Sequence, residues 1–428
     1  MTPARVMVHN SVAKLKERQK HAGVAIMVRV ASLFSQLLEQ IPRSRFAEIV
    51  ARHAGDRAAK GFTCWGQFVA MLFCHLAQAD SLRTICGGLA LCLGKLVHLG
   101  LRGAPRRSTL SYANAHRPAA IYEDLFWAML EHFRQLRMLG STRHFRFKNK
   151  LLLLDSTTIS LCLSLFDWAS FRRAKGGVKL HVLLDHDDYM PQWVLLSEAR
   201  RHDRKAASLL SLKAGSIVAM DRAYNDYRLF DTWCERGIFF VTRMKDNAQW
   251  VLIRALDPPQ GRRILSDGLI EWYEPLARQK CPRTLRRIVV WDPVEEREIV
   301  LLTNHLEFGA TTIAAIYKER WQIELFFKAL KQLLRIKTFV GTSENALRIQ
   351  IWTALIAILL LKWLHFISKA KWSLTILAAM LRMSLFTYRD LRQWLDNPFG
   401  APPWTPQEGP FQLELPLFGQ PRTVPGGT

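Results

Sequence analysis

A stripe of polar side chains is predicted along residues 317–331, whose sequence is YKERWQIELFFKALK. The segment has no Pro or Gly, and its apolar residues recur at three- and four-residue steps, which predicts an α-helix. At about 100° per residue, Glu319 points away, and a face about 60° wide carries four other side chains: Tyr317, Arg320, Glu324 and Lys331. One carboxylate among cations suits a metal ligand beside phosphate-binding groups. The alternative is a solvated ion pair between Arg320 and Glu324.

Two more carboxylates lie at short apolar runs upstream. Asp155 ends the run Lys150–Asp155, and Asp221 directly follows the run Ser216–Met220. Both runs have the length and composition of buried β-strands. Each acid also has an ordinary structural interpretation, as a helix cap after the first run and as a turn residue that pairs with Arg222 after the second.

The elements around these runs predict how the chain folds from residue 146 to residue 345. We expect three antiparallel strands followed by helix, strand, helix and strand, which is the order of a ribonuclease-H-like α/β core. The further elements are strands Gly177–Leu184 and Gln192–Glu198, helix Arg204–Leu212, helix Tyr227–Arg236 and strand Ile238–Thr242. Residues 248–305 are predicted to form a β-rich insertion.

In such a core the first and fourth strands are neighbours, so Asp155 and Asp221 would meet at one sheet edge and Glu324 would complete the set. Three carboxylates without a neutralising partner repel one another unless a cation lies between them. Oxygen ligands suit Mg²⁺ or Mn²⁺, and a pair of such ions promotes in-line phosphoryl displacement. The predicted site is therefore a nuclease or strand-transfer site.

Composition indicates a polyanion as partner. The net charge is +24, and the first 150 residues hold 23 Lys and Arg against 8 Asp and Glu, or +15 of the total. Such a concentration of positive charge is typical of nucleic-acid binding. Residues 102–118 could supply DNA contacts: Ser108 is a predicted N-cap, Arg106 and Arg107 would bind phosphates, and Asn114 would face base edges. A basic interhelical loop is the alternative.

The remaining patterns define the other parts of the chain. The apolar run Ile351–Leu361 is too short to span a bilayer and predicts a buried helix, and the first 20 residues contain no apolar segment of a signal peptide. Met27 opens a stretch that looks like a natural domain start. We predict a basic extension at 1–26, an all-α DNA-binding domain at 27–145, the catalytic core at 146–345, C-terminal helices at 346–396 and a proline-rich disordered tail at 397–428.

Three sequence features together resemble one protein family. They are LLLLDSTT around Asp155, DRAYNDY from Asp221, and the Tyr-x2-Arg-x3-Glu-x6-Lys spacing of 317–331. They are similar to the DDE transposases of bacterial insertion sequences, in particular the "IS-four" family with its YREK signature. The resemblance runs from about Met27 to Leu395 and includes the β-rich insertion. Ala223 stands where relatives often carry Gly or Glu.

The resemblance implies cut-and-paste transposition with two Mg²⁺ or Mn²⁺ ions bound by Asp155, Asp221 and Glu324. Water would cleave at the transposon end, and the freed 3′-OH would attack first the opposite strand, forming a hairpin in relatives, and later the target DNA. The implied DNA-binding residues are Arg222, Tyr224, Tyr317, Arg320 and Lys331. The implied partners are terminal inverted repeats, target DNA and a second copy in a homodimeric synaptic complex, in the bacterial cytoplasm at the nucleoid and without a membrane.

Two other functions remain open at this point. A ribonuclease-H-like nuclease or resolvase would share the three carboxylates but would not join a 3′-OH end to new DNA. A catalytically inactive DNA-binding protein would keep the basic N-terminal part, but should have lost one of the acids.

Overall fold

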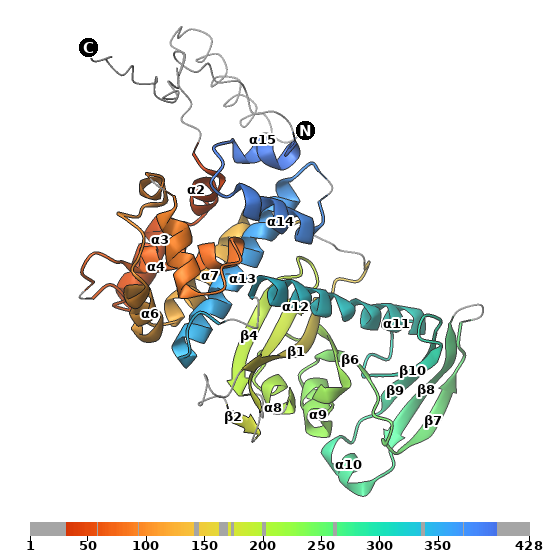
Figure 1. Ribbon diagram of the computed structural model, residues 1–428. Coiled ribbons are helices and arrows are strands. Elements are labelled where there is room, and N and C mark those ends of the chain that lie inside the picture. The colour runs from red at the N-terminus through yellow and green to blue at the C-terminus, as the bar shows by residue number, and fades with distance from the viewer. Residues whose placement is uncertain are drawn as a thin grey trace, which may run out of the picture.

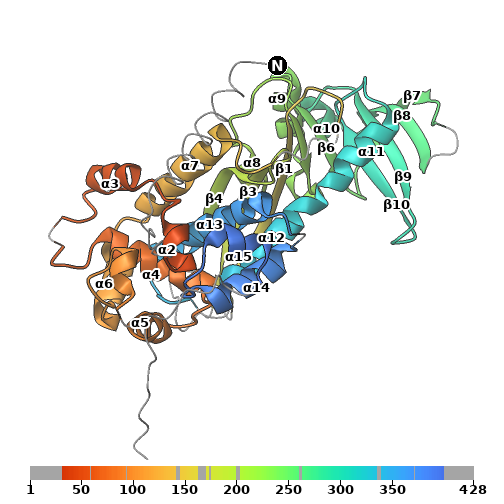
Figure 2. The same ribbon diagram turned by 90° about the horizontal axis from the view of Figure 1, so that it is seen from above.

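The computed structural model describes residues 31–399, apart from 58, 93, 141–144, 162–169, 173–174, 199–202, 260–262, 335–338 and 371. The predicted basic extension at 1–26, Met27 and residues 400–428 of the predicted tail lie outside the described residues. Figures 1 and 2 show a helical region on one side of the molecule and a large sheet on the other.

The chain begins with helices, as the sequence predicts. Ser32 and Thr63 cap two of them, because each side-chain oxygen accepts a hydrogen bond from a main-chain N–H three residues later. The predicted N-cap at Ser108 is wrong: the N-cap is Arg106, which has extended backbone geometry, so the helix begins at Arg107, two residues earlier than predicted. The helices are α2 (Leu33–Leu38), α3 (Arg43–Arg52), α4 (Cys64–Leu76), α5 (Leu82–Ala90), the short 3-10 helix η1 (Leu96–Leu99), α6 (Arg107–His116) and α7 (Ala120–Gln135).

A mixed α/β region with one ten-stranded sheet follows. Its strands are β1 (Leu151–Leu161), β2 (Ser170–Arg172), β3 (Lys175–Asp185), β4 (Pro191–Glu198), β5 (Ile217–Met220), β6 (Phe239–Arg243), β7 (Trp250–Leu256), β8 (Ile264–Trp272), β9 (Leu285–Asp292) and β10 (Arg297–Thr303). Its helices are α8 (Asp203–Ala207), the 3-10 helix η3 (Arg222–Tyr224), α9 (Tyr227–Glu235), α10 (Pro275–Lys280), α11 (Ala310–Glu319) and α12 (Trp321–Leu334).

Strand order places β1 at the centre of the part that carries the acids. β3 lies on one side of β1 and β5 on the other; β4 pairs with β3, and β6 follows β5. β1, β5 and β6 are parallel, whereas β3 and β4 are antiparallel to their neighbours. The predicted insertion extends the same sheet: β10 pairs antiparallel with β6, and the strand order continues through β9 and β8 to β7.

Both faces of β1 are covered, which explains its unbroken apolar run. Leu151 and Leu153 belong to the core shared with the helical region, whereas Leu152 and Leu154 belong to a second core under α8, α9 and α10. A strand buried on both faces is apolar at every position instead of alternating. Figure 1 shows α11 and α12 along one face of the sheet and α8, α9 and α10 on the other.

The chain returns to the helical region through a long buried helix, α13 (Glu344–Ile367), followed by α14 (Leu374–Ser384) and α15 (Leu391–Asp396). Among the described helices, α13 alone is long and apolar enough to cross a membrane by length and composition, and 83% of its most apolar window is buried within the protein. It packs against α4, α7 and α12. The helix is therefore longer than the predicted run 351–361, but it is a buried core helix as expected.

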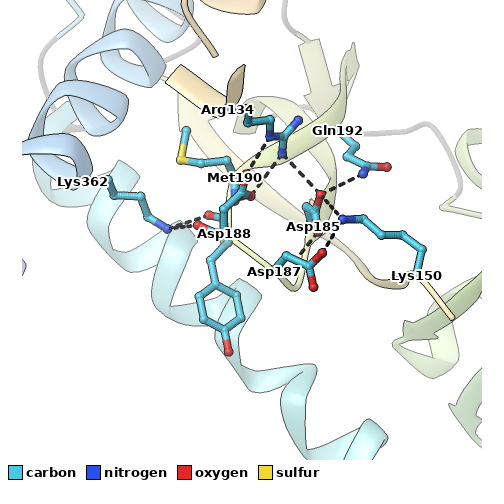
Figure 3. Close-up of polar contacts among 9 residues, drawn as sticks. Arg134, Lys150, Asp185, Asp187, Asp188, Met190, Gln192 and Lys362 are labelled. Atoms are coloured by element: carbon cyan, nitrogen blue, oxygen red, sulfur yellow. Dashed lines mark hydrogen bonds and ion pairs between the residues drawn. The ribbon is translucent and has the colours of Figure 1, made fainter. Parts of the chain in front are cut away.

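The turn between β3 and β4 ties the sheet to this helical region (Figure 3). Arg134 of α7 contacts Asp188 through Nε (2.6 Å) and Asp185 through Nη2 (3.5 Å). Lys150 Nζ, just before β1, lies 2.7 Å from Asp185 Oδ2. Lys362 of α13 donates to the main-chain oxygen of Asp188 (2.9 Å). These contacts fix the orientation of the sheet relative to α7 and α13.

Candidate active site

Asp155 and Asp221 follow the last paired residues of two neighbouring parallel strands. β1 and β5 pair from Leu151 with Ile217 to Leu154 with Met220, and the two acids come next on each chain. Asp155 does not end its strand as predicted, because β1 continues to Leu161 in its pairing with β3. It lies instead where the pairing with β5 ends, so the sheet opens between the two carboxylates.

Local hydrogen bonds orient both acids. Asp155 Oδ1 accepts from the main-chain N–H of Ser156 (2.7 Å), and Asp221 Oδ1 accepts from that of Ala223 (2.9 Å). Asp221 thereby caps η3 as a turn residue, but it does not pair with Arg222 as the structural alternative expected, because Arg222 pairs with Asp246.

The predicted helix 317–331 is divided into α11 and α12, with Arg320 between them. Arg320 has helical φ and ψ values of −52° and −30°, so the face predicted from the sequence is largely kept. Its guanidinium lies between two acids: Nη1 is 3.2 Å from Asp155 Oδ2 and Nη2 is 2.7 Å from Glu324 Oε1. It also lies 5.8 Å from the ring centre of Tyr317. The ion pair with Glu324 thus exists, but it is part of a bridge that also holds Asp155.

Glu319 points elsewhere, as the helical geometry predicted. It accepts a hydrogen bond from the hydroxyl of Tyr189 (3.2 Å), in the turn between β3 and β4. The other acid of this segment therefore holds the junction of α11 and α12 in place.

Burial and the charges of the two other acids affect the ionisation of Asp155. Burial raises the pKa of Asp155 to about 6; the Ser156 N–H and Arg320 oppose this shift, and the negative charges of Asp221 and Glu324 add to it. Burial disfavours the charged form of a carboxylic acid, and nearby like charges do the same. A cation between these oxygens would reverse the effect.

Asp155 and Glu324 open into a groove with a volume of about 480 Å³ between β1 and α12. Lys331 lines this groove, as the shared face of the helix predicted, and so does Lys328, which the sequence analysis missed. Lys328 follows Glu324 by four residues, a spacing that places both on one helix face and could have identified it. The groove is lined by Asp155, Ser156, Thr157, Glu324, Phe327, Lys328, Lys331 and Gln332.

This geometry agrees with the comparisons with known proteins. The model of the Transposase DDE domain family matches residues 146–360, half of the chain. The chain belongs to the DDE transposase family. A second family model, for a domain of unknown function (DUF4372), matches residues 29–102.

Named relatives support the same family. A putative transposase, y4zB, from Sinorhizobium fredii is 33% identical over 264 residues, which cover 60% of this chain and 71% of the relative. A probable transposase for insertion sequence element IS5377 from Geobacillus stearothermophilus is 34% identical over 52% of this chain and 59% of the relative. A putative transposase for insertion sequence element IS4SA from Synechocystis is 25% identical over 60% of this chain and 71% of the relative.

Among solved structures, the piggyBac transposase synaptic complex with hairpin DNA matches 83% of this chain and 79% of that chain, with a TM-score of 0.39 and 10% identity, a likeness too distant to carry an argument. The family itself makes this protein a DNA transposase, an enzyme that cleaves and joins DNA.

DDE transposases depend on divalent metal ions, and the carboxylates of this transposase fit that requirement. Arg320 already shows that a positive group can lie between Asp155 and Glu324. Within the described part of the chain, no three His, Cys, Asp or Glu side chains are already grouped as metal ligands. The oxygen donors suit a hard cation, which would compete with the guanidinium for them.

The two residues predicted to assist DNA binding after Asp221 lie in different surroundings. Arg222 is exposed, and its Nη1 lies 3.0 Å from Asp246. Tyr224 is fully buried, and its hydroxyl lies 3.2 Å from His181 Nδ1. Arg222 is therefore open to solvent, whereas the Tyr224 hydroxyl faces the protein interior.

Tyr224 belongs to a polar network behind Asp155 that the sequence analysis did not find. Asp203 Oδ1 accepts from Ser156 Oγ (2.8 Å) and lies 3.5 Å from His181 Nδ1. Lys179 Nζ lies 2.8 Å from Asp203 Oδ2. Ser156 is next to Asp155, and its hydroxyl is held by Asp203 at the start of α8, so this network fixes the strand on which the acid lies.

In the helical region, α6 presents only part of the predicted DNA-binding set. Arg106 and Arg107 are exposed at its start. Asn114 is 1% exposed, and its Oδ1 accepts from Gln67 Nε2 (2.8 Å), so the prediction that it faces base edges is wrong. Arg117 donates to the main-chain oxygen of Phe62 and is likewise structural. Tertiary packing of α6 against α4 turns these two polar groups inward.

Proposed function

We propose that this transposase carries out cut-and-paste transposition with Asp155, Asp221 and Glu324 as its catalytic carboxylates. The observation that carries the proposal is the opening of the sheet after Leu154 and Met220, which leaves two acids side by side, with Arg320 linking one of them to Glu324. Carboxylates so arranged suit two Mg²⁺ or Mn²⁺ ions, which supply Lewis acidity for in-line attack by water or by a 3′-OH.

We infer that the core is ribonuclease-H-like. The strand order β4-β3-β1-β5-β6, with β3 and β4 antiparallel and β1, β5 and β6 parallel, supports this inference. Residues 248–305 then form an insertion that extends the sheet from β6. The YREK spacing, and a relative named for the element IS4SA, support membership of the IS-four family.

The residues around the acids have distinct proposed roles. Lys328 and Lys331 line the groove beside Glu324 and would bind DNA phosphates. Arg320 bridges Asp155 and Glu324, and its guanidinium would turn to a phosphate oxygen once metal ions take over these carboxylates. Tyr317 packs beside this guanidinium and would position it. Arg222, exposed next to Asp221, would contact the transposon end, and Tyr224 would support that turn from inside.

The proposed partners are the terminal inverted repeats and the target DNA, bound by a homodimer in which two ends are brought together. The helical domain 27–145 would hold DNA through exposed cations such as Arg106 and Arg107. The helices of 346–396 complete the core of that domain. The protein would act at the bacterial nucleoid in the cytoplasm.

The test is an in vitro reaction with purified protein, Mg²⁺ and a plasmid that carries the inverted repeats flanking the gene. We expect excision of the element followed by joining of its 3′-OH ends to a second plasmid, and no product in EDTA. Cleavage without joining would instead indicate a nuclease or resolvase. Binding with neither reaction would indicate a regulatory protein, and either result would overturn the proposal.

A further inference from the structure

A second concave surface lies on the face of the sheet opposite α12. One hollow of about 510 Å³ is bounded by the start of α9, the connection from β6 to β7, and α10. A second hollow of about 350 Å³ lies along α8 and α9 and shares Arg204, Asp226 and Arg228 with the first. Together they form one continuous surface, which we call the basic groove.

The groove is strongly positive. Its lining includes two acids, Asp226 and Glu274, against six cations: Arg204, Lys205, Arg228, Arg236, Lys245 and Lys280.

The two acids offset only part of this positive charge. Asp226 is engaged as the N-cap of α9, where it accepts from the main-chain N–H groups of Arg228 (3.0 Å) and Leu229 (3.2 Å), and it lies 3.5 Å from Arg204. Among the described residues, Lys205, Arg228, Lys245 and Lys280 form no ion pair within 4.0 Å. An excess of unpaired cations in a concave surface attracts anions.

The environment of Lys245 disfavours its charged form. It is half-buried, and its Nζ donates to the main-chain oxygen of Asn225 (3.1 Å). Burial, and then the positive charge of Arg204, lowers the pKa of Lys245. A bound anion would relieve both effects, because it would partner the ammonium and screen the two cations from each other.

The groove begins at the catalytic edge of the sheet. Asn225 and Asp226 line it, and they follow Asp221 and η3 directly. The groove that holds Lys328 and Lys331 lies between β1 and α12, on the other face. Figure 1 shows α12 and α9 on opposite sides of the strands that carry the acids. The carboxylates therefore lie between two separate basic surfaces.

We propose that the basic groove over α8, α9 and α10 is a second DNA-backbone site of this transposase. It binds phosphodiesters of the DNA segment that leaves the catalytic edge on the side away from α12. This site rests on the protein being a DNA transposase and does not depend on which residues perform the reaction.

The test measures DNA binding by the full chain in EDTA, by fluorescence anisotropy across a range of salt concentrations. The double variant Lys205→Gln, Arg228→Gln is compared with wild type on a duplex with the transposon end and flanking sequence. The slope of log K against log salt is negative, and each lost phosphate contact should reduce its magnitude by about 0.9, so we expect the magnitude to decrease by about 1.8. The decrease should be similar on a duplex of unrelated sequence, because phosphate contacts do not read bases.

Arg297→Gln is the matched control, an exposed cation of the same sheet that lies outside the groove and should leave the slope unchanged. Thermal unfolding checks that all variants fold. A wild-type slope in the double variant, or an equal decrease in the control, would overturn the proposal. A third result would also overturn it: inorganic pyrophosphate raises the thermal stability of wild type but not of the double variant, while the salt slopes for DNA are the same in both. The groove would then bind small phosphate compounds instead of DNA. Since no cleavage is measured, failure here is distinct from failure of the catalytic assignment.

Discussion

Arg320 has two possible partners at the proposed active site: the protein's own carboxylates and the phosphates of DNA. In the free chain it pairs with Asp155 and Glu324, and its side chain is only 15% exposed. This pairing neutralises part of a carboxylate cluster that would otherwise repel itself. Metal ions and the guanidinium compete for the same oxygens.

Replacing Arg320 by Ala should therefore strengthen Mn²⁺ binding to the DNA-free protein. An ion pair of about 1 kcal/mol corresponds to an increase in affinity of roughly fivefold. Isothermal titration calorimetry measures this directly. Arg348→Ala removes an ion pair of the same i,i+4 spacing on α13, with Glu344, away from the carboxylates, and should leave Mn²⁺ affinity unchanged. Unchanged or weaker Mn²⁺ binding by Arg320→Ala would contradict the competition.

Lys331 is exposed along the groove beside Glu324. If it contacts one phosphate, Lys331→Ala should weaken end binding and reduce the magnitude of the negative salt slope by about 0.9. Lys318→Ala is the control, since Lys318 is also exposed but lies on α11 and does not line the groove. The same salt slope in Lys331→Ala and wild type would show that this lysine faces only solvent.

At the scale of elements, a buried histidine joins α4 to α13. His75 is 1% exposed, and its Nε2 lies 2.9 Å from Thr353 Oγ1. Burial lowers the pKa of His75 from 6.5 to about 4. Between these values the unfolded chain binds a proton that the folded chain excludes, so this contribution to stability is complete above pH 6.5 and is lost as the pH falls through about 4.

Wild type should accordingly lose up to roughly 3 kcal/mol of unfolding free energy through this one group between pH 7 and pH 4. His75→Gln removes the titrating group. The unfolding free energy of this variant should therefore fall less between pH 7 and pH 4 than that of wild type, whatever its value at pH 7. Urea unfolding at several pH values gives the comparison, and His116→Gln, at an exposed position, should behave as wild type. Parallel pH profiles for His75→Gln and wild type would show that His75 does not titrate as described.

Local patterns predicted most of these elements, because helical periodicity and apolar runs are local features. The strands at β1, β3, β4, β5 and β6 lie where the sequence places them. The continuation of β1 beyond Asp155 was not predicted, because it depends on pairing with β3. The pairing of β10 with β6 was missed for the same reason: a strand's partner is chosen by contacts distant in sequence.

At the scale of the whole molecule, the carboxylates could be located from strand order and helix geometry alone. The burial of individual polar side chains could not be predicted from the sequence. Asn114 and Tyr224 are polar residues in basic or turn-like segments, yet both are buried. The basic groove was also invisible in the sequence, because its cations are spread from Arg204 to Lys280 and meet only after α8, α9 and α10 pack on one face of the sheet. The net charge of +24 therefore includes a local excess outside the N-terminal 150 residues.

The central claim is that Asp155, Asp221 and Glu324 act together in DNA cleavage and strand transfer. The most direct measurement uses Asp155→Asn, Asp221→Asn and Glu324→Gln in the Mg²⁺ excision and joining reaction, with end binding measured in parallel. The account predicts that each variant loses at least about a thousandfold in both cleavage and joining of pre-cut 3′-OH ends, since each removes a metal ligand, while binding stays within a few-fold of wild type. Near-normal cleavage or joining by any one of the three would contradict it.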